Sequence, residues 1–233
     1  MMRHLVSATC GLFLACTGAA VAQMQPVLVE LYTSQGCSSC PPADEIFSKL
    51  AKDPGIVALS LHVDYWDYIG WKDTFASPQF TKRQKAYAKA AGSRMIYTPQ
   101  VVVAGVLQVQ GNDVMAVSES IRHALTQDSP VELSVARQAD QVVIQAMTPA
   151  PFPRPTRVQV VRYRPEETVD IGRGENAGRQ VTYHNIVTSW QPVAEWGGEA
   201  PLNMTVEAAG PEPVVVIIQA EGPAQVLAVA QIK

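Results

Sequence analysis

The sequence predicts an α/β domain followed by an all-β, sandwich-like domain. Between residues 26 and 125, apolar runs of strand length alternate with segments whose apolar residues recur at helical spacing. After Pro130 short alternating segments, separated by Pro, Gly and Asn, take over, which is typical of a β-sandwich. We therefore assign residues 23–129 to the first domain and residues 130–233 to the second.

The sequence pattern at the start of the first domain predicts two parallel strands joined by a helix. Residues 27–32 form an apolar strand pattern, and residues 40–51 carry apolar side chains at helical spacing. Residues 56–63 are almost continuously apolar, as expected for a strand that is covered on both faces. Because a helix connects the two strands, we expect them to run parallel.

The next helix has clear ends. Ser77 is the expected N-cap, Pro78 suits the first helical position, and Gly92 suits the position after the C-cap. The remaining elements of this half are strands at residues 100–103 and 106–110 and a helix at about residues 112–125.

The sequence pattern of the second half of the chain predicts strands separated by turns. They are expected at residues 131–136, 142–146, 158–163, 181–187, 214–218 and 226–229. The glycine-rich segment 172–178 is interpreted as a hairpin loop, with a recognition loop as the alternative.

Residues 1–22 have the layout of a secretory signal peptide. Arg3 precedes an apolar stretch at residues 5–15, and small residues lead up to Ala22. The apolar stretch is shorter than the roughly 20 residues that span a bilayer. We expect cleavage after Ala22 and a periplasmic or secreted protein; the alternative is a lipoprotein processed at Cys16.

The composition is that of an ordinary globular protein. The chain has 233 residues, of which 47% are hydrophobic and 17% charged, with a net charge of −3. Because no Lys/Arg block occurs, nucleic acid and anionic membrane surfaces are not expected as partners, and no membrane span is expected in the mature protein.

Cys37 and Cys40 form a candidate redox pair at the turn between the first strand and its helix. Signal cleavage would remove Cys10 and Cys16, so the mature protein would keep only this pair. A helix N-terminus stabilises a thiolate. We expect Cys37 to be the exposed nucleophile and Cys40 the shielded residue that resolves a mixed disulfide.

Four motifs carry a family resemblance. They are Cys-Ser-Ser-Cys-Pro-Pro-Ala-Asp from residue 37, His-Val-Asp-Tyr-Trp-Asp from 62, Gly-Trp-Lys-Asp from 70 and Tyr-Thr-Pro-Gln from 97. With the order of the elements, they resemble the thioredoxin fold and, more narrowly, the secreted thioredoxin-like proteins catalogued as the domain of unknown function 1223 family. The family lends a fold and a redox expectation but no assigned reaction.

The resemblance also implies roles for three further residues. It implies a cis Thr98–Pro99 bond that sets the Thr98 backbone beside the cysteines, where it pairs with a substrate chain. Glu30 resembles a buried acid that relays the proton of Cys40. The alternative is a carboxylate at the strand end that reaches water.

Aromatic side chains are expected around this site. Trp66 and Trp71 belong to an aromatic and acidic insertion, interpreted as a lid that faces the substrate together with Tyr97. The alternative is that the two tryptophans cover the sheet edge or the domain interface.

These residues favour a secreted or periplasmic thiol-disulfide oxidoreductase without a diffusible cofactor. Its expected partners are cell-envelope proteins that carry thiols or disulfides. Three alternatives stay open: a copper metallochaperone that uses Cys37, Cys40 and His62, a thioredoxin-like binding module without turnover, and a static structural disulfide.

Overall fold

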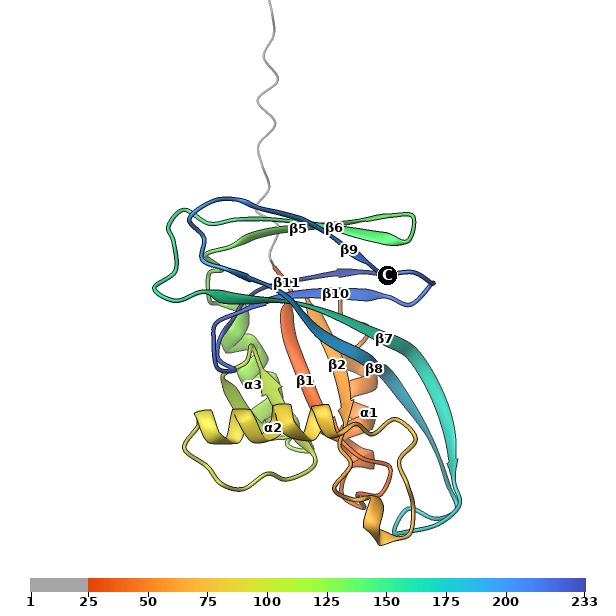
Figure 1. The fold of residues 1–233 in the computed structure, drawn as a ribbon. Helices are drawn as coiled ribbons and strands as arrows, with labels where there is room; N and C mark the ends of the chain where they lie inside the picture. Colours follow the sequence, from red (N-terminus) through yellow and green to blue (C-terminus); the bar gives the residue numbers. More distant parts are fainter. Residues whose placement is uncertain (1–24) are drawn as a thin grey trace, which may run out of the picture.

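The computed structural model describes residues 25–233, which form mostly strands (Figure 1). The helices are α1 (Pro41–Leu50), α2 (Pro78–Ala90) and α3 (Val114–Leu125), with a short 3-10 helix η1 (Asp67–Ile69). The first half contains the strands β1 (Val27–Thr33), β2 (Ile56–His62), β3 (Gln100–Val103) and β4 (Leu107–Gln110). The second half contains β5 (Glu132–Gln138), β6 (Gln141–Met147), β7 (Thr156–Ile171), β8 (Arg179–Trp196), β9 (Leu202–Glu207), β10 (Val214–Gln219) and β11 (Val226–Ile232).

One 8-stranded sheet runs through both halves of the chain. Its order is β11-β10-β7-β8-β2-β1-β3-β4. β1 and β2 are parallel, as predicted, with Thr33 opposite His62. β8 also lies parallel to β2, with Ser60 opposite Ile186, and Asn185 Nδ2 donates a hydrogen bond of 2.9 Å to a β2 carbonyl oxygen. The second half is therefore joined to the first by strand pairing.

The predicted fold class, a thioredoxin-like α/β domain followed by a separate all-β sandwich, is wrong. The elements up to Leu125 follow in the predicted order. However, residues 25–233 contain only the three α-helices named above, and strands of both halves share one mixed sheet. The physical reason is that apolar alternation locates a strand without specifying its neighbour. β7 and β8, of 16 and 18 residues, also extend well beyond the predicted segments.

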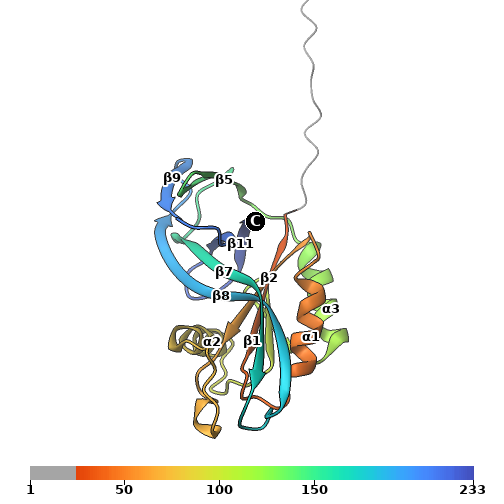
Figure 2. The same cartoon turned by 90° about the vertical axis from the view of Figure 1, so that its right-hand side faces the viewer.

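Helices cover both faces of the sheet where β1 and β2 lie. α1 and α3 pack on one face with a core that includes Phe47 and Val117, and α2 packs on the other with Phe80 and Tyr87 (Figure 2). At the other end, the 3-stranded sheet β5-β6-β9 packs on β7, β10 and β11 through a third apolar core. The cysteine loop lies between the end of β1 and the start of α1.

The predicted signal peptide, residues 1–22, and the alternative lipidation site Cys16 lie outside the described residues. Within residues 25–233, no helix is both long enough and apolar enough to cross a membrane.

Candidate functional site

The cysteine pair lies on the loop between β1 and α1. Cys37 and Cys40 are joined by a disulfide, with their Cα atoms 5.4 Å apart. The Cys37 N–H donates to Ser34 O at 3.1 Å, and the Cys40 N–H donates to Cys37 O at 3.2 Å. α1 begins at Pro41, since proline fits the first turn, where an N–H group has no partner within the helix. Cys40 is therefore the N-cap of α1.

Both cysteines are buried. Cys37 and Cys40 are each 0% exposed, whereas Ser38 and Ser39 between them are exposed. The predicted contrast between an exposed Cys37 and a shielded Cys40 is therefore wrong in this disulfide form. A partner molecule can reach either sulfur only after the segments that cover the loop have moved.

The segment before β3 lies beside the cysteine loop. The Thr98–Pro99 bond has the predicted cis conformation. Ser39 Oγ lies 3.4 Å from the carbonyl oxygen of Thr98 and 3.5 Å from Cys37 Sγ. Ser39 therefore bridges one cysteine and the Thr98 backbone, so the two segments converge as the sequence predicts.

The segment around η1 covers the loop with two tryptophans. Trp66 Nε1 donates a hydrogen bond of 2.7 Å to Thr98 Oγ1, and Trp71 Nε1 donates one of 2.8 Å to Gln35 Oε1. Both indole N–H groups are thus bound by the protein's own atoms in this form. Tyr97, the third predicted substrate contact, is 38% exposed nearby. A substrate role for the three aromatic residues stays a prediction.

A second cover comes from the tip of the β7–β8 hairpin, which reaches down to the η1 segment (Figure 1). Asn176 Nδ2 donates hydrogen bonds of 2.9 Å to the carbonyl oxygens of Gln35 and Cys37. A Cβ atom on Gly174 would lie only 3.2 Å from Trp71 Cβ, so the tip packs tightly against that tryptophan. The sequence predicts the hairpin loop, but it does not predict that this loop docks on the cysteine loop. The one sequence feature that could have indicated the contact is an asparagine among glycines.

Glu30 is fully buried but points away from the cysteines. Its Oε2 and Oε1 accept hydrogen bonds of 2.7 and 2.8 Å from Arg83 of α2. The hydroxyl groups of Tyr32 and Tyr87 donate to it at 2.9 and 2.7 Å. Alternate residues of β1 face opposite sides of the sheet, and Glu30 lies on the α2 side. Among the described residues, the predicted relay from Cys40 to Glu30 therefore has no contact that supports it.

A buried polar cluster that the sequence analysis missed adjoins the cysteine loop. His62 Nδ1 lies 2.7 Å from Asp73 Oδ2, and the same oxygen accepts the backbone N–H of Gln35 at 2.8 Å. Asp44 of α1 accepts a hydrogen bond of 2.9 Å from Thr33 Oγ1. The available signal was the position of Asp44, four residues after Cys40 and next to apolar residues on the same stripe.

The two carboxyl groups of this cluster differ in acidity. Burial raises the pKa of Asp44 to about 7, although the charge of His62 and the hydrogen bond from Thr33 oppose the shift. Burial would also raise the pKa of Asp73, but the charge of His62 and hydrogen bonds to the carboxylate outweigh it and hold that pKa below its ordinary value. Asp73 is therefore ionised at neutral pH, whereas Asp44 titrates near neutrality.

The alternative copper site has no preformed geometry. Within residues 25–233, no group of three or more His, Cys, Asp or Glu side chains is arranged to hold a metal ion. His62 Nδ1 is bound to Asp73, and the sulfur atoms of Cys37 and Cys40 are bonded to each other.

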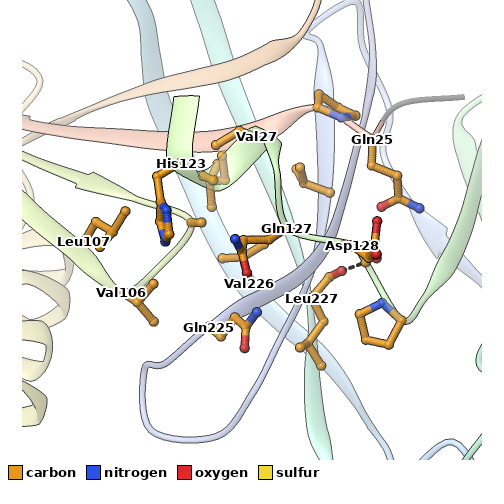
Figure 3. A pocket seen from close by; sticks show the side chains of 18 residues that line it. Gln25, Val27, Val106, Leu107, His123, Gln127, Asp128, Gln225, Val226 and Leu227 are labelled. Carbon is orange, nitrogen blue, oxygen red and sulfur yellow. Dashed lines mark hydrogen bonds between the residues drawn. The ribbon is translucent and has the colours of Figure 1, made fainter. Parts of the chain in front are cut away.

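A cavity of about 250 Å³ lies at the far end of β1 (Figure 3). Its wall includes Val27, His123 and Leu227. The cysteine loop follows the opposite end of β1, after Thr33, so this cavity plays no part in the site.

Comparisons with known proteins find relatives that are similar to this chain in sequence and in structure. It is 33% identical to protein AGR_C_4864 from Agrobacterium tumefaciens, whose crystal structure matches with a TM-score of 0.77 over 91% of this chain and 96% of that one. HBP35 of Porphyromonas gingivalis matches with a TM-score of 0.59 at 12% identity, over 90% of this chain and 75% of that one, and shows a shared fold alone.

A curated relative from Archaeoglobus fulgidus is described as "Probable Thioredoxin". It is 42% identical over 38 residues, which are 16% of this chain and 42% of the relative, so less than half of that protein is matched. A family model covers far more of the chain, from residue 28 to residue 219. This chain therefore belongs to the family described as "Protein of unknown function (DUF1223)".

Proposed function

We propose that this protein is a secreted or periplasmic thiol-disulfide oxidoreductase whose Cys37–Cys40 pair cycles between disulfide and dithiol. The observation that carries the proposal is a disulfide between cysteines three positions apart, with the Thr98 backbone held beside it by Ser39. The short match to a protein described as "Probable Thioredoxin" points to the same chemistry.

The reaction is an exchange of disulfides. A substrate thiolate attacks Cys37 Sγ, the Cys37–Cys40 bond breaks, and Cys40 Sγ leaves with the bonding electron pair and gains a proton. A second substrate thiolate then attacks the substrate sulfur of the mixed disulfide and releases Cys37. The substrate is oxidised and the protein pair reduced; the reverse sequence reduces a substrate disulfide.

The positions of the two cysteines support the roles that we propose for them. Cys37 contacts Ser39, which is exposed and touches the Thr98 backbone, so once the covering segments have moved, a partner at that surface should meet Cys37 before Cys40. Cys40 is the N-cap of α1, and its carbonyl oxygen accepts the N–H groups of Ala43 and Asp44, which are both buried. Cys37 is therefore the proposed nucleophile and Cys40 the resolving residue.

A trapping experiment tests the proposal. In Cys40→Ala, the Cys37 thiolate can attack a partner disulfide and release one partner thiol, but the mixed disulfide cannot be resolved from within, so adducts with disulfide-bearing cell-envelope proteins should accumulate. Cys37→Ala and the double variant Cys37→Ala/Cys40→Ala are the matched controls and should trap few partners. Non-reducing gels followed by mass spectrometry count the adducts. The proposal fails if Cys40→Ala traps no more than the double variant and the wild-type disulfide does not exchange with glutathione.

A further inference from the structure

Asp44 lies one helical turn after Cys40 on the buried side of α1. Its N–H donates to Cys40 O at 3.1 Å, Cys40 has helical backbone angles, and the two residues are 6% and 0% exposed. Residues four apart share a helix face, with Cβ atoms about 5–6 Å apart. Helical side chains also lean toward the N-terminus of their helix. We therefore expect the Asp44 carboxyl group to lean toward the Cys40 side chain.

This carboxyl group has one oxygen without a protein partner. Oδ1 accepts the hydrogen bond from Thr33, whereas Oδ2 is buried and has no hydrogen-bond partner among the described residues. His62 Nε2, in the same cluster, is also buried and without a partner there. Buried polar atoms are nearly always paired, and exceptions call for a functional explanation. Asp44 Oδ2 is thus an acceptor available for a proton.

An open groove is lined in part by Asp44. The groove has a volume of about 480 Å³ and runs between the start of α1 and β8, where Pro41, Asp44 and Arg179 line it. Pro41 directly follows Cys40 in the chain, although Cys40 itself does not line the groove. Neither Ser39 nor Thr98, which mark the proposed approach of a partner, lines it. A proton can therefore leave through the groove while a partner occupies the other side of the loop.

We propose that Asp44 accepts the proton of the Cys40 thiol during resolution of a mixed disulfide, and that the groove between α1 and β8 passes this proton to solvent. The inference rests on the proposed function. Ionised Asp44 takes the proton from Cys40 Sγ, and the resulting thiolate attacks Cys37 Sγ. The Cys37–Cys40 bond forms as the bond from Cys37 to the partner sulfur breaks. The partner leaves as a thiolate with the electron pair and takes a proton from water.

The surroundings of Asp44 suit this role. The titratable and charged groups that face it from other elements are His62 of β2, Asp73 of the segment after η1, and Arg179, Tyr183 and His184 of β8. Burial dominates their combined effect and raises the pKa of Asp44 to about 7. A group with a pKa near the working pH can both take up and release a proton.

The test follows resolution in the full-length mature protein. The reduced protein is mixed with oxidised glutathione and quenched with acid, and mass spectrometry measures the glutathione adduct and the internal disulfide over time. In Asp44→Asn, which keeps an oxygen for Thr33, the adduct should resolve about tenfold more slowly or worse at about pH 7. The difference should shrink toward about pH 9, where solvent removes the thiol proton without help. Asp44→Glu, which keeps a carboxyl group, should retain most of the wild-type rate.

Glu45→Gln is the matched control, because it removes the same charge at the next position of α1. The Glu45 carboxylate is exposed and pairs with Lys49 at 3.9 Å, so this variant should resolve at the wild-type rate. The inference is overturned if Asp44→Asn resolves as fast as wild type at about pH 7, or if Glu45→Gln slows resolution equally. Either result would leave the proposed oxidoreductase function standing. If wild type forms no internal disulfide with oxidised glutathione at all, the proposed function itself fails.

Discussion

Asn176 Nδ2 donates a hydrogen bond of 2.9 Å to the carbonyl oxygen of Cys37, although 139 positions separate the two residues in the sequence. The same amide also donates a hydrogen bond to Gln35 O, so the hairpin tip is bound to the loop just before the disulfide. Trp66 and Trp71 close over the loop from the η1 segment. Two segments from distant parts of the chain therefore pack on the loop that carries the buried cysteines, and we expect that exchange with a partner requires at least one of them to open.

Asn176→Ala should loosen the hairpin cover. It removes the donor from two buried carbonyl oxygens, which should lower the free energy of unfolding by about 1–3 kcal/mol. Because local opening becomes easier by a similar amount, reduction of the disulfide by dithiothreitol should become about tenfold faster. Denaturant unfolding and the rate of thiol release measure the two effects.

Thr168→Ala provides the control for this prediction. Thr168 lies on the same hairpin, in a side-chain hydrogen bond with Thr182 that is exposed to solvent. Its loss should leave the reduction rate unchanged. An unchanged reduction rate in Asn176→Ala would show that the hairpin does not control access to Cys37.

Glu30 and Arg83 should behave as a structural ion pair. Arg83→Met leaves the Glu30 carboxylate buried without its cation, which should cost about 3–5 kcal/mol of unfolding free energy. The double variant Glu30→Gln/Arg83→Met should recover much of that loss, because no unpaired charge remains buried. Unfolding by urea across the four proteins of a double-mutant cycle measures the coupling.

The same cycle separates Glu30 from proton transfer. Glu30→Gln should resolve mixed disulfides at the wild-type rate, because the contacts of Glu30 lie on the α2 side of β1. Slow resolution of mixed disulfides in Glu30→Gln, with an unchanged free energy of unfolding, would show that Glu30 does relay the proton of Cys40.

The sequence was informative wherever local chemistry decides structure. Prolines after Cys40 set the start of α1, Ser77 caps α2, and the Thr98–Pro99 segment lies beside the cysteine loop. These features depend on neighbouring residues, on backbone hydrogen bonds, or on the rule that parallel strands end at one edge.

Features that depend on which elements become neighbours were not predictable. The alternation of β1 puts Glu30 and Tyr32 on one face, but only the packing of α2 shows that this face is the one away from Cys40. Likewise, the pairing of β8 with β2 at Ser60 and Ile186 leaves no local mark, and it is this pairing that overturns the fold class. Strand β9 was missed although its apolar residues alternate regularly.

The processing of the N-terminus is a further prediction from the sequence. The exported protein should begin at Gln23, because Ala20 and Ala22 offer the small side chains that a signal-peptide cleavage site needs. Intact mass of protein from the periplasm or the medium measures the start. A chain that begins with lipid-modified Cys16 would contradict this prediction and identify a lipoprotein.

The pKa of Asp44 also makes a prediction about stability. Its pKa is about 7 in the folded protein, against an ordinary value of 3.8 that the unfolded chain should retain. Between these values the folded state holds a proton that the unfolded state has released. The contribution of Asp44 to the free energy of unfolding therefore falls as the pH rises from about 4 to about 7. At higher pH the full loss of stability persists.

Asp44→Asn should consequently be more stable than wild type at alkaline pH. Asparagine cannot ionise, so the variant avoids the burial of a charge, and its advantage should grow by about 3–4 kcal/mol between about pH 4 and pH 8. Asp73, whose pKa is lowered, contributes with the opposite sign, but it is present in both proteins and largely cancels in the difference. Urea unfolding of both proteins across this range measures the gap, with Glu45→Gln as the exposed control. A gap that stays constant with pH would show that Asp44 does not titrate inside the folded protein, and it would remove the electrostatic support for its role as proton acceptor.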